Sequence, residues 1–121
     1  MDQRVVWGFL SFIAFAATAL AAPPENADPT LAPWFQSLKV PGTHESCCSI
    51  ADCRITDYKQ SKDGYEVLID ARFDLFPEQK PGWMAVPPER VLEQTDNPTG
   101  RAVVCYVPSR GILCFVRPAE T

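Results

Sequence analysis

Cysteine is the residue type in this chain best suited to chemistry. There are five cysteines, Cys47, Cys48, Cys53, Cys105 and Cys114, and the first three follow His44 closely. A thiolate can act as a nucleophile, bind a soft metal ion or end up in a disulfide, and its surroundings decide which of these happens. We therefore consider each use of these thiols before the elements that would position them.

A metal site is one use of the segment that starts at His44. His44, Cys47, Cys48 and Cys53 lie within ten residues, and thiolate ligands select Cu(I) or zinc. However, zinc sites typically bring pairs of ligands that are about two to four residues apart, and adjacent cysteines seldom bind one tetrahedral ion. We therefore expect no metal and no cofactor, and we expect His44 to be a solvated loop residue.

A catalytic thiol is a second use of the same segment. Cys47 or Cys48 beside His44 would form a thiolate–imidazolium pair, but no third residue that would orient the imidazole is evident. The Cys-x-x-Cys motif of a thioredoxin-like redox centre does not occur in the sequence. The sequence names no catalytic residue, and we expect a protein that is not an enzyme.

The first 22 residues predict export. Arg4 precedes an uncharged apolar run from Val5 to Ala22, and Ala19 and Ala21 fit a small-residue cleavage site. This is the layout of a secretory signal peptide, although a run of about 18 apolar residues also approaches the length of a membrane anchor. Because the run ends in small residues, we favour cleavage and a periplasmic or extracellular protein, with no stable membrane insertion afterwards.

Length and composition predict one small domain after the signal. About 99 residues remain, and a domain of that size buries only about 60–65% of its unfolded surface, so disulfides would help to stabilise it. The net charge is −4 with both signs interspersed, which argues against nucleic-acid binding. We expect a flexible, proline-rich leader at residues 23–32 and a disulfide-stabilised domain at residues 33–121.

Short strands dominate the expected domain. Apolar patterning bounded by turn residues predicts five of them, at residues 54–60, 65–70, 83–86, 102–107 and 112–116. A short helix is expected from Pro33 to Leu38, and single helical turns near Ser49–Asp52 and at residues 87–92. The sequence therefore predicts a mainly β fold, either a small curved antiparallel sheet or a five-stranded barrel. The alternative is a two-layer α+β arrangement in which the Trp34 helix packs on the sheet.

Disulfide pairing follows in part from geometry. Export places the thiols where disulfides persist, and an odd number leaves one sulfur over. Cys47 and Cys48 are not expected to bridge each other, because adjacent Cα atoms are about 3.8 Å apart, below the usual range for disulfides. One of these two is the expected leftover thiol, pointing outward from an extended segment. An outward thiol would link to a second subunit, form a mixed disulfide with a small thiol or bind a soft metal ion. We favour a disulfide-linked homodimer, or a buried, inert thiol, over the metal.

The pairing of Cys105 and Cys114 stays open at this point. If Pro108 opposes Gly111 in the last hairpin, the two cysteines face each other and form a cross-strand bridge. If Gly111 forms a bulged turn, the register shifts by one residue and the two sulfurs lie on opposite faces. They would then reach back to the segment from Cys47 to Cys53.

Two stretches of the chain resemble a family of small exported proteobacterial proteins. The first holds Trp34-Phe35-x-Ser37-Leu38, Pro41-Gly42 and Cys47-Cys48-Ser49-x-Ala51-Asp52-Cys53-Arg54. The second holds Asp96-Asn97-Pro98-x-Gly100-Arg101-Ala102-Val103-Val104-Cys105-Tyr106 and then Gly111-Ile112-Leu113-Cys114-Phe115-Val116. No activity is established for that family. The resemblance therefore implies a bacterial, periplasmic protein and assigns no functional residues.

These patterns favour a binding or structural module of the cell envelope. Its partner would be another protein or a small molecule. We expect Trp34 and Trp83 to be core residues, and an aromatic patch with Tyr65 and Tyr106 is a candidate contact surface. The alternative is a periplasmic metal- or thiol-handling protein that uses His44, Cys47, Cys48 and Cys53.

Overall fold

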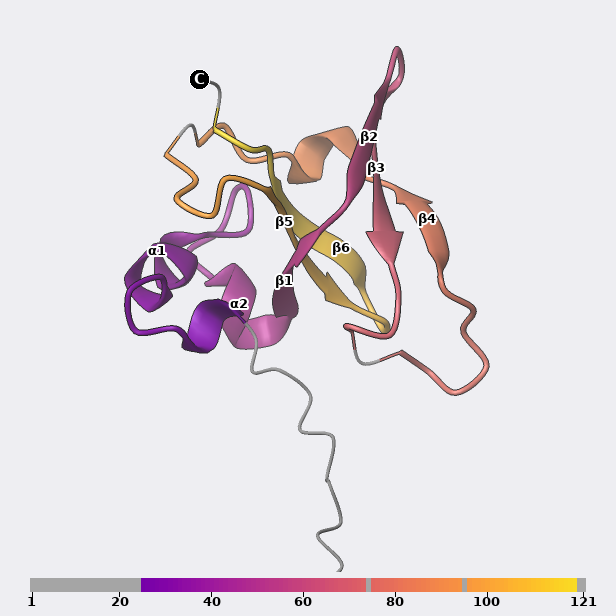
Figure 1. Cartoon of the computed structure of the whole chain (residues 1–121), viewed down its shortest axis with the longest axis horizontal. Helices are drawn as coiled ribbons and strands as arrows, with labels where there is room; N and C mark the ends of the chain where they lie inside the picture. Colours follow the sequence, from indigo (N-terminus) through magenta and orange to yellow (C-terminus); the bar gives the residue numbers. More distant parts are fainter. Residues whose placement is uncertain (1–24, 74, 95, 120–121) are drawn as a thin grey trace, which may run out of the picture.

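A computed structural model of the protein describes residues 25–73, 75–94 and 96–119 (Figure 1). The expected signal peptide, residues 1–22, lies outside these ranges. The elements along the described chain are η1 (Glu25–Ala27), α1 (Ala32–Ser37), α2 (Cys47–Ile50), β1 (Asp52–Thr56), β2 (Tyr58–Ser61), β3 (Gly64–Ile69), β4 (Gly82–Ala85), η2 (Pro88–Arg90), β5 (Ala102–Val107) and β6 (Gly111–Val116).

Two antiparallel sheets, each of three strands within the described residues, build the fold. The central sheet has the order β1-β5-β6 and the second sheet the order β2-β3-β4. The short helices α1 and α2 lie on one side of the central sheet, and the second sheet covers its other side (Figure 1). The prediction of a mainly β fold is confirmed. The closed barrel is wrong, because the strands hydrogen-bond within two separate sheets, and the two-layer alternative is not needed.

Strands β5 and β6 are buried on both faces. Val103 and Cys105 pack toward the helices, whereas Val104 and Tyr106 pack toward the second sheet. A strand that is covered on both faces reads as a continuous apolar run, which explains the Ala-Val-Val-Cys-Tyr-Val sequence of β5. The β5–β6 hairpin therefore lies between two hydrophobic cores and contributes side chains to both.

The chain passes from one sheet to the other between β1 and β2. Thr56 is buried at this corner, and its hydroxyl donates a hydrogen bond to the Leu68 carbonyl oxygen over 2.6 Å. The Leu68 N–H in turn donates to the Asp57 carbonyl oxygen over 3.1 Å. The single strand predicted at residues 54–60 is thus two strands, because a strand that turns a corner contributes to both sheets.

Side chains occupy the outer edge of β1 at Ile55. The Glu25 carboxylate accepts a hydrogen bond from the Ile55 N–H over 3.3 Å, and the Arg72 guanidinium donates to the Ile55 carbonyl oxygen over 3.1 Å. Arg72 is itself held by both carboxylate oxygens of Asp70. Pairing these backbone groups protects an edge strand from association. Part of the leader expected to be flexible, η1, is therefore fixed against β1.

The helical turns lie close to the predicted positions, with one difference. Helix α1 starts next to Pro33 as expected, and η2 lies within residues 87–92. The turn expected from Ser49 to Asp52 instead starts at Cys47, after Ser46. Both adjacent cysteines consequently lie in a helical turn and not in an extended segment.

A buried amide ties the loop before β5 to the end of β6. The Asn97 Nδ2 group donates hydrogen bonds to the Arg101 carbonyl oxygen over 2.7 Å and to the Arg117 carbonyl oxygen over 3.0 Å. Its Oδ1 atom accepts from the backbone N–H and the hydroxyl of Thr99. Asn97 is 3% exposed, so each of these bonds replaces a contact with water.

We predict that Asn97→Asp lowers the free energy of unfolding by about 2–4 kcal/mol at neutral pH, because a carboxylate would face two carbonyl oxygens. The variant keeps the size of the side chain and removes only its donors. Gln60→Glu makes the same chemical change on the exposed strand β2 and should stay within about 0.5 kcal/mol of the parent. Urea titration of both variants checks this, and equal losses would contradict the role of the Asn97 amide.

Candidate functional site

The cysteines gather between α2 and the central sheet. Cys47 and Cys48 lie on α2, Cys53 on β1, Cys105 on β5 and Cys114 on β6, all of them within the described residues. Cys47 is bonded to Cys114 with an S–S distance of 1.99 Å, and Cys53 to Cys105 with an S–S distance of 2.03 Å. The two bridges join α2 to β6 and β1 to β5, so they attach the start of the domain to its end.

The cross-strand bridge between Cys105 and Cys114 is wrong. Gly111, with a φ of +84°, does form a bulged turn, and Val107 pairs with Gly111. A second irregularity follows, because Tyr106 pairs with Ile112 while Cys105 pairs with Cys114, which leaves Leu113 as an extra residue in β6.

This extra residue returns both cysteines to the face that packs on the helices. Cys105 also lies directly opposite Cys53 on its other side, and it pairs there. The sequence of the β5–β6 hairpin alone does not show that Cys53 lies beside Cys105. The long-range pairing, which the sequence left open, is therefore the one observed.

Cys48 is the free cysteine of the described chain, in agreement with the prediction that Cys47 or Cys48 is left over. The prediction that its side chain points outward is wrong. The side chain is half-buried, and its thiol donates a hydrogen bond to the Phe35 carbonyl oxygen over 3.4 Å. Loss of solvation raises the pKa of Cys48 to about 12, opposed by a hydrogen bond with Asn26 and reinforced by the carboxylate of Asp52. Cys48 is therefore a protonated thiol at neutral pH.

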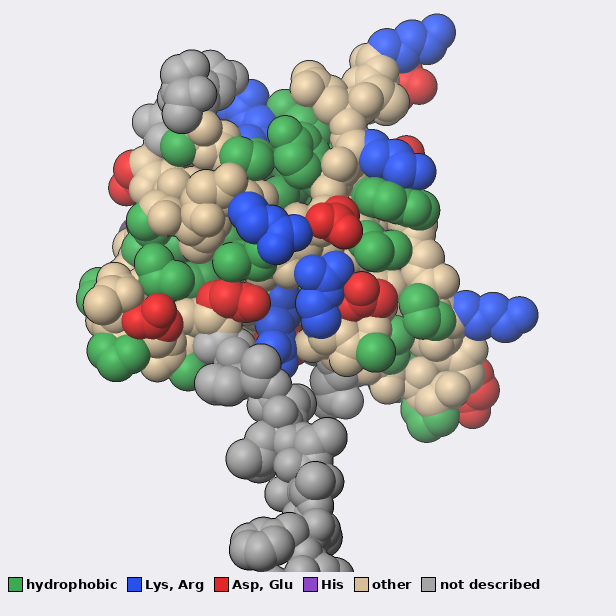
Figure 2. Space-filling view, in the orientation of Figure 1, with side chains coloured by type: hydrophobic (Ala, Val, Ile, Leu, Met, Phe, Trp, Pro, Cys, Tyr) green, Lys and Arg blue, Asp and Glu red, His purple; other side chains and the backbone are tan. Residues whose placement is uncertain are grey.

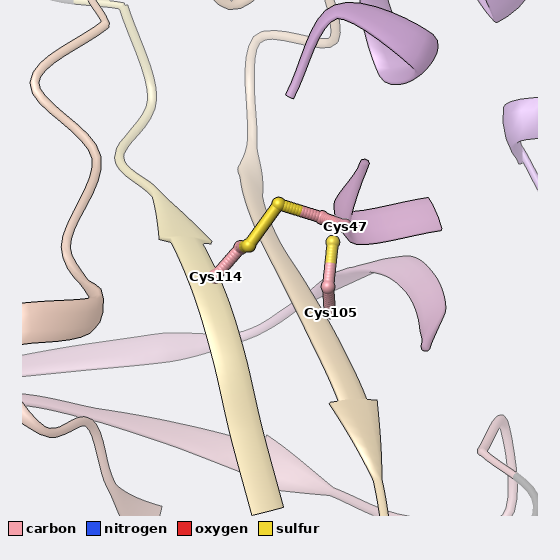
Figure 3. Close-up of side chains that lie close together, drawn as sticks. All are labelled: Cys47, Cys105 and Cys114. Atoms are coloured by element: carbon pink, nitrogen blue, oxygen red, sulfur yellow. A yellow bond between two sulfur atoms is a disulfide. The ribbon is translucent and has the colours of Figure 1, made fainter. Parts of the chain in front are cut away.

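The sulfur atoms form two groups that share one member. Those of Cys48, Cys53 and Cys105 lie within 4.8 Å of one another, and so do those of Cys47, Cys105 and Cys114. Figure 3 shows the Cys105 sulfur pointing toward the bridge between Cys47 and Cys114. Cys105 thus connects the free thiol with both bridges.

The residues considered for a metal site are not brought together as a ligand set. His44 is exposed in the turn before α2 and belongs to neither group of sulfurs in the described part of the chain. Cys47 and Cys53 are each bonded to another sulfur, and a metal ligand has to be a thiolate. In this oxidised form, Cys48 is the member of the expected set that retains a thiol.

The candidate aromatic residues have different environments. Tyr106 is buried against Phe73, and Tyr65 packs on Phe115 with ring centroids 5.1 Å apart. Trp83 on β4 is 42% exposed, and the ammonium of Lys59 lies 4.0 Å from the centre of its ring. The expectation that Trp83 is a core residue is therefore wrong, and of these three side chains it is the one available to a partner.

A hollow of about 420 Å³ lies at the corner between the sheets, lined by Thr56, Asp57, Tyr58, Gly100, Arg101, Ala102 and Pro118. An ion pair between Asp57 and Arg101, with an N–O distance of 3.0 Å, contributes its charged groups, and both side chains are more than half exposed. Sequence reasoning missed this pair because 44 residues separate its members. Exposed pairs of this kind contribute little to stability.

No protein-family model, curated protein or solved structure matches the chain. Within the described ranges, no helix has the length and apolar character needed to cross a membrane.

The two bridges close nested loops, which decides how much each one contributes. They span 67 and 52 residues along the chain. Once one bridge has formed, closing the other encloses only about 15 further residues, which corresponds to about 3 kcal/mol in the chain-entropy account. Either bridge alone would contribute about 4 kcal/mol.

We therefore predict that replacing Cys53 and Cys105 by alanine lowers the free energy of unfolding by about 3 kcal/mol, and that removing both bridges costs about 7 kcal/mol. A Cys48→Ser background prevents the free thiol from forming a substitute bridge. Denaturant titration of these variants checks the prediction. If removing both bridges lowers the free energy of unfolding by less than about 1 kcal/mol, the hydrophobic cores stabilise the fold without them.

Proposed function

We propose that the chain is an exported, non-enzymatic protein of the cell envelope that binds another protein through the outer face of the β2-β3-β4 sheet. The observation that carries this proposal is the exposure of Trp83 on a sheet whose other face packs on the hydrophobic core. Burying a tryptophan from water is strongly favourable, so an exposed one on the edge strand β4 is a candidate contact residue.

The outer face is defined by the alternation of side chains along the three strands. Val67 and Ile69 of β3 and Met84 of β4 pack inward, so their neighbours along the strands point outward. The outer face therefore consists of Lys59, Glu66, Leu68, Trp83 and Ala85. Leu68 and Trp83 are direct cross-strand partners, and Lys59 and Glu66 are as well. An apolar pair thus lies beside a charged pair.

This composition favours a protein partner over a small molecule. Contact sites for proteins typically have a tryptophan, tyrosine or arginine at the centre and polar groups around it. Figure 2 shows hydrophobic side chains interspersed with lysine or arginine side chains on the side of the molecule formed by β3 and β4. Small ligands prefer concave sites, and the hollow described above lies at Asp57 and Arg101, away from Trp83.

The two bridges support the export part of the proposal. Disulfides persist in oxidising compartments such as the periplasm and the extracellular space, and small exported domains depend on them because their cores are limited. The apolar N-terminal segment, which predicts a signal peptide, agrees with this location. A periplasmic or extracellular site of action is therefore part of the proposal.

We predict that a photo-crosslinking amino acid at Ala85, on the outer face, captures a protein partner in intact cells. Trp83→Ala should remove this adduct and weaken binding of the purified partner by at least about 30-fold, the effect of a residue that dominates an interface. Phe76→Ala is the matched control, because Phe76 is 53% exposed and does not belong to the outer face. It should leave the adduct and the affinity unchanged.

Two results would contradict this function. One is an adduct at Ala85 that persists at full yield in the Trp83→Ala protein. The other is an adduct that forms from Gln36, exposed on α1 at the other side of the molecule, but not from Ala85. Urea titration of the Trp83→Ala protein should show a loss of no more than about 1 kcal/mol, because the contacts of this exposed side chain are with its surface neighbours Lys59 and Leu68, and this separates lost binding from lost folding.

A further inference from the structure

We propose that the five cysteines form an internal thiol–disulfide exchange network, in which Cys48 attacks the Cys53–Cys105 bridge and Cys105 then attacks the Cys47–Cys114 bridge. This goes beyond the proposed binding function and does not depend on it. It also differs from the alternative metal or thiol site considered in the sequence analysis, because its central residue is Cys105 and His44 takes no part.

The arrangement of the sulfurs supports the first step. The helical turn α2 directs the Cys48 side chain inward, and its sulfur lies within 4.8 Å of the sulfurs of both Cys53 and Cys105. A thiolate exchanges with a disulfide by approaching one of its two sulfurs, so the free thiol already lies beside its target. Cys48 and Cys53 lie on either side of the junction of α2 and β1, so a bridge between them closes a short segment of the chain.

The first step is balanced without any oxidant. The Cys48 thiol loses its proton to solvent, and the thiolate attacks the Cys53 sulfur. The bond between Cys48 and Cys53 forms, the bond between Cys53 and Cys105 breaks, and the electron pair of the broken bond stays on Cys105. Cys105 leaves as a thiolate and then takes up a proton. The number of disulfides and the number of free thiols do not change.

In the second step, Cys105 attacks the Cys47–Cys114 bridge and Cys47 becomes the free thiol. The Cys105 sulfur lies within 4.8 Å of those of Cys47 and Cys114, and Cys105 and Cys114 are direct cross-strand partners. Attack of the Cys105 thiolate on Cys114 forms a bridge within the β5–β6 hairpin and releases the Cys47 thiolate. The free thiol thus moves from the half-buried Cys48 to the fully buried Cys47.

The surroundings of Cys48 keep the network at rest near neutral pH. Burial raises its pKa to about 12, so very little thiolate is present. The groups that face it are the Asp52 carboxylate from β1, the Asn26 side chain from η1 and the Phe35 carbonyl oxygen from α1. Because the thiolate population rises with pH up to about 12, the exchange rate should rise by about tenfold for each pH unit below that value.

Peptide mapping of the oxidised full chain tests the proposal. The protein is incubated at about pH 7 and about pH 10, quenched in acid and alkylated, so that the label marks the free cysteine. Cleavage after Arg101 and Arg110 separates Cys105 from Cys114, and cleavage before Asp52 separates Cys53 from Cys47 and Cys48. We expect label on Cys48 near neutral pH, and label on Cys105 and Cys47 as well after the alkaline incubation, at a rate independent of protein concentration.

Cys48→Ser is the matched control, because it removes the attacking sulfur and leaves both bridges. It should show no label at either pH, which would establish Cys48 as the source of the exchange. Label that stays on Cys48 at alkaline pH would overturn the proposal, provided that the same protein exchanges its bridges at that pH once unfolded in denaturant. A rate proportional to protein concentration would overturn it too, because the exchange would then occur between molecules.

Discussion

The β5–β6 hairpin presents Cys105 and Cys114 on the same face because Leu113 is an extra residue in β6. This irregularity brings Cys114 under Cys47 of α2, while Cys105 meets Cys53 of β1. Helix α2 is thereby attached to β6, and β1 to β5. The opposite face of β5 and β6 stays free to pack on the second sheet. Both hydrophobic cores depend on this placement.

Much of the fold could be predicted from local signals. Asp63-Gly64 marks a hairpin, Pro33 marks the start of a helix, and the apolar runs at residues 102–107 and 112–116 are strands. These features depend on backbone preferences within a few residues. The corner at Asp57 could not be predicted, because the hydrogen bond that fixes it comes from Leu68, which lies outside the strand that turns. The same holds for the contacts of Glu25 and Arg72 with Ile55.

The candidate site could be predicted only in part, for a related reason. The short Cα–Cα distance of adjacent residues argued against a bridge between Cys47 and Cys48, and this left Cys48 as one of two candidates for the free thiol. That distance is not decisive by itself, because the Cα atoms of the bonded Cys53 and Cys105 are 3.9 Å apart. Its inward orientation depends on the helical turn of α2 and on the position of Phe35. Likewise, alternation predicts that Val67 and Ile69 share a face, whereas the pairing register of β3 and β4 places Trp83 beside Leu68 on the opposite, outer face.

The pairing of the cysteines is the claim on which the rest of the account depends, and non-reducing peptide mapping of freshly purified protein in acid tests it most directly. The account predicts that the peptide of residues 102–110 is linked to the peptide that holds Cys53. It also predicts that the peptide of residues 111–121 is linked to the peptide that holds Cys47, with Cys48 alkylated. A direct link between residues 102–110 and 111–121 would contradict it, because Cys105 would then be bonded to Cys114 within the hairpin.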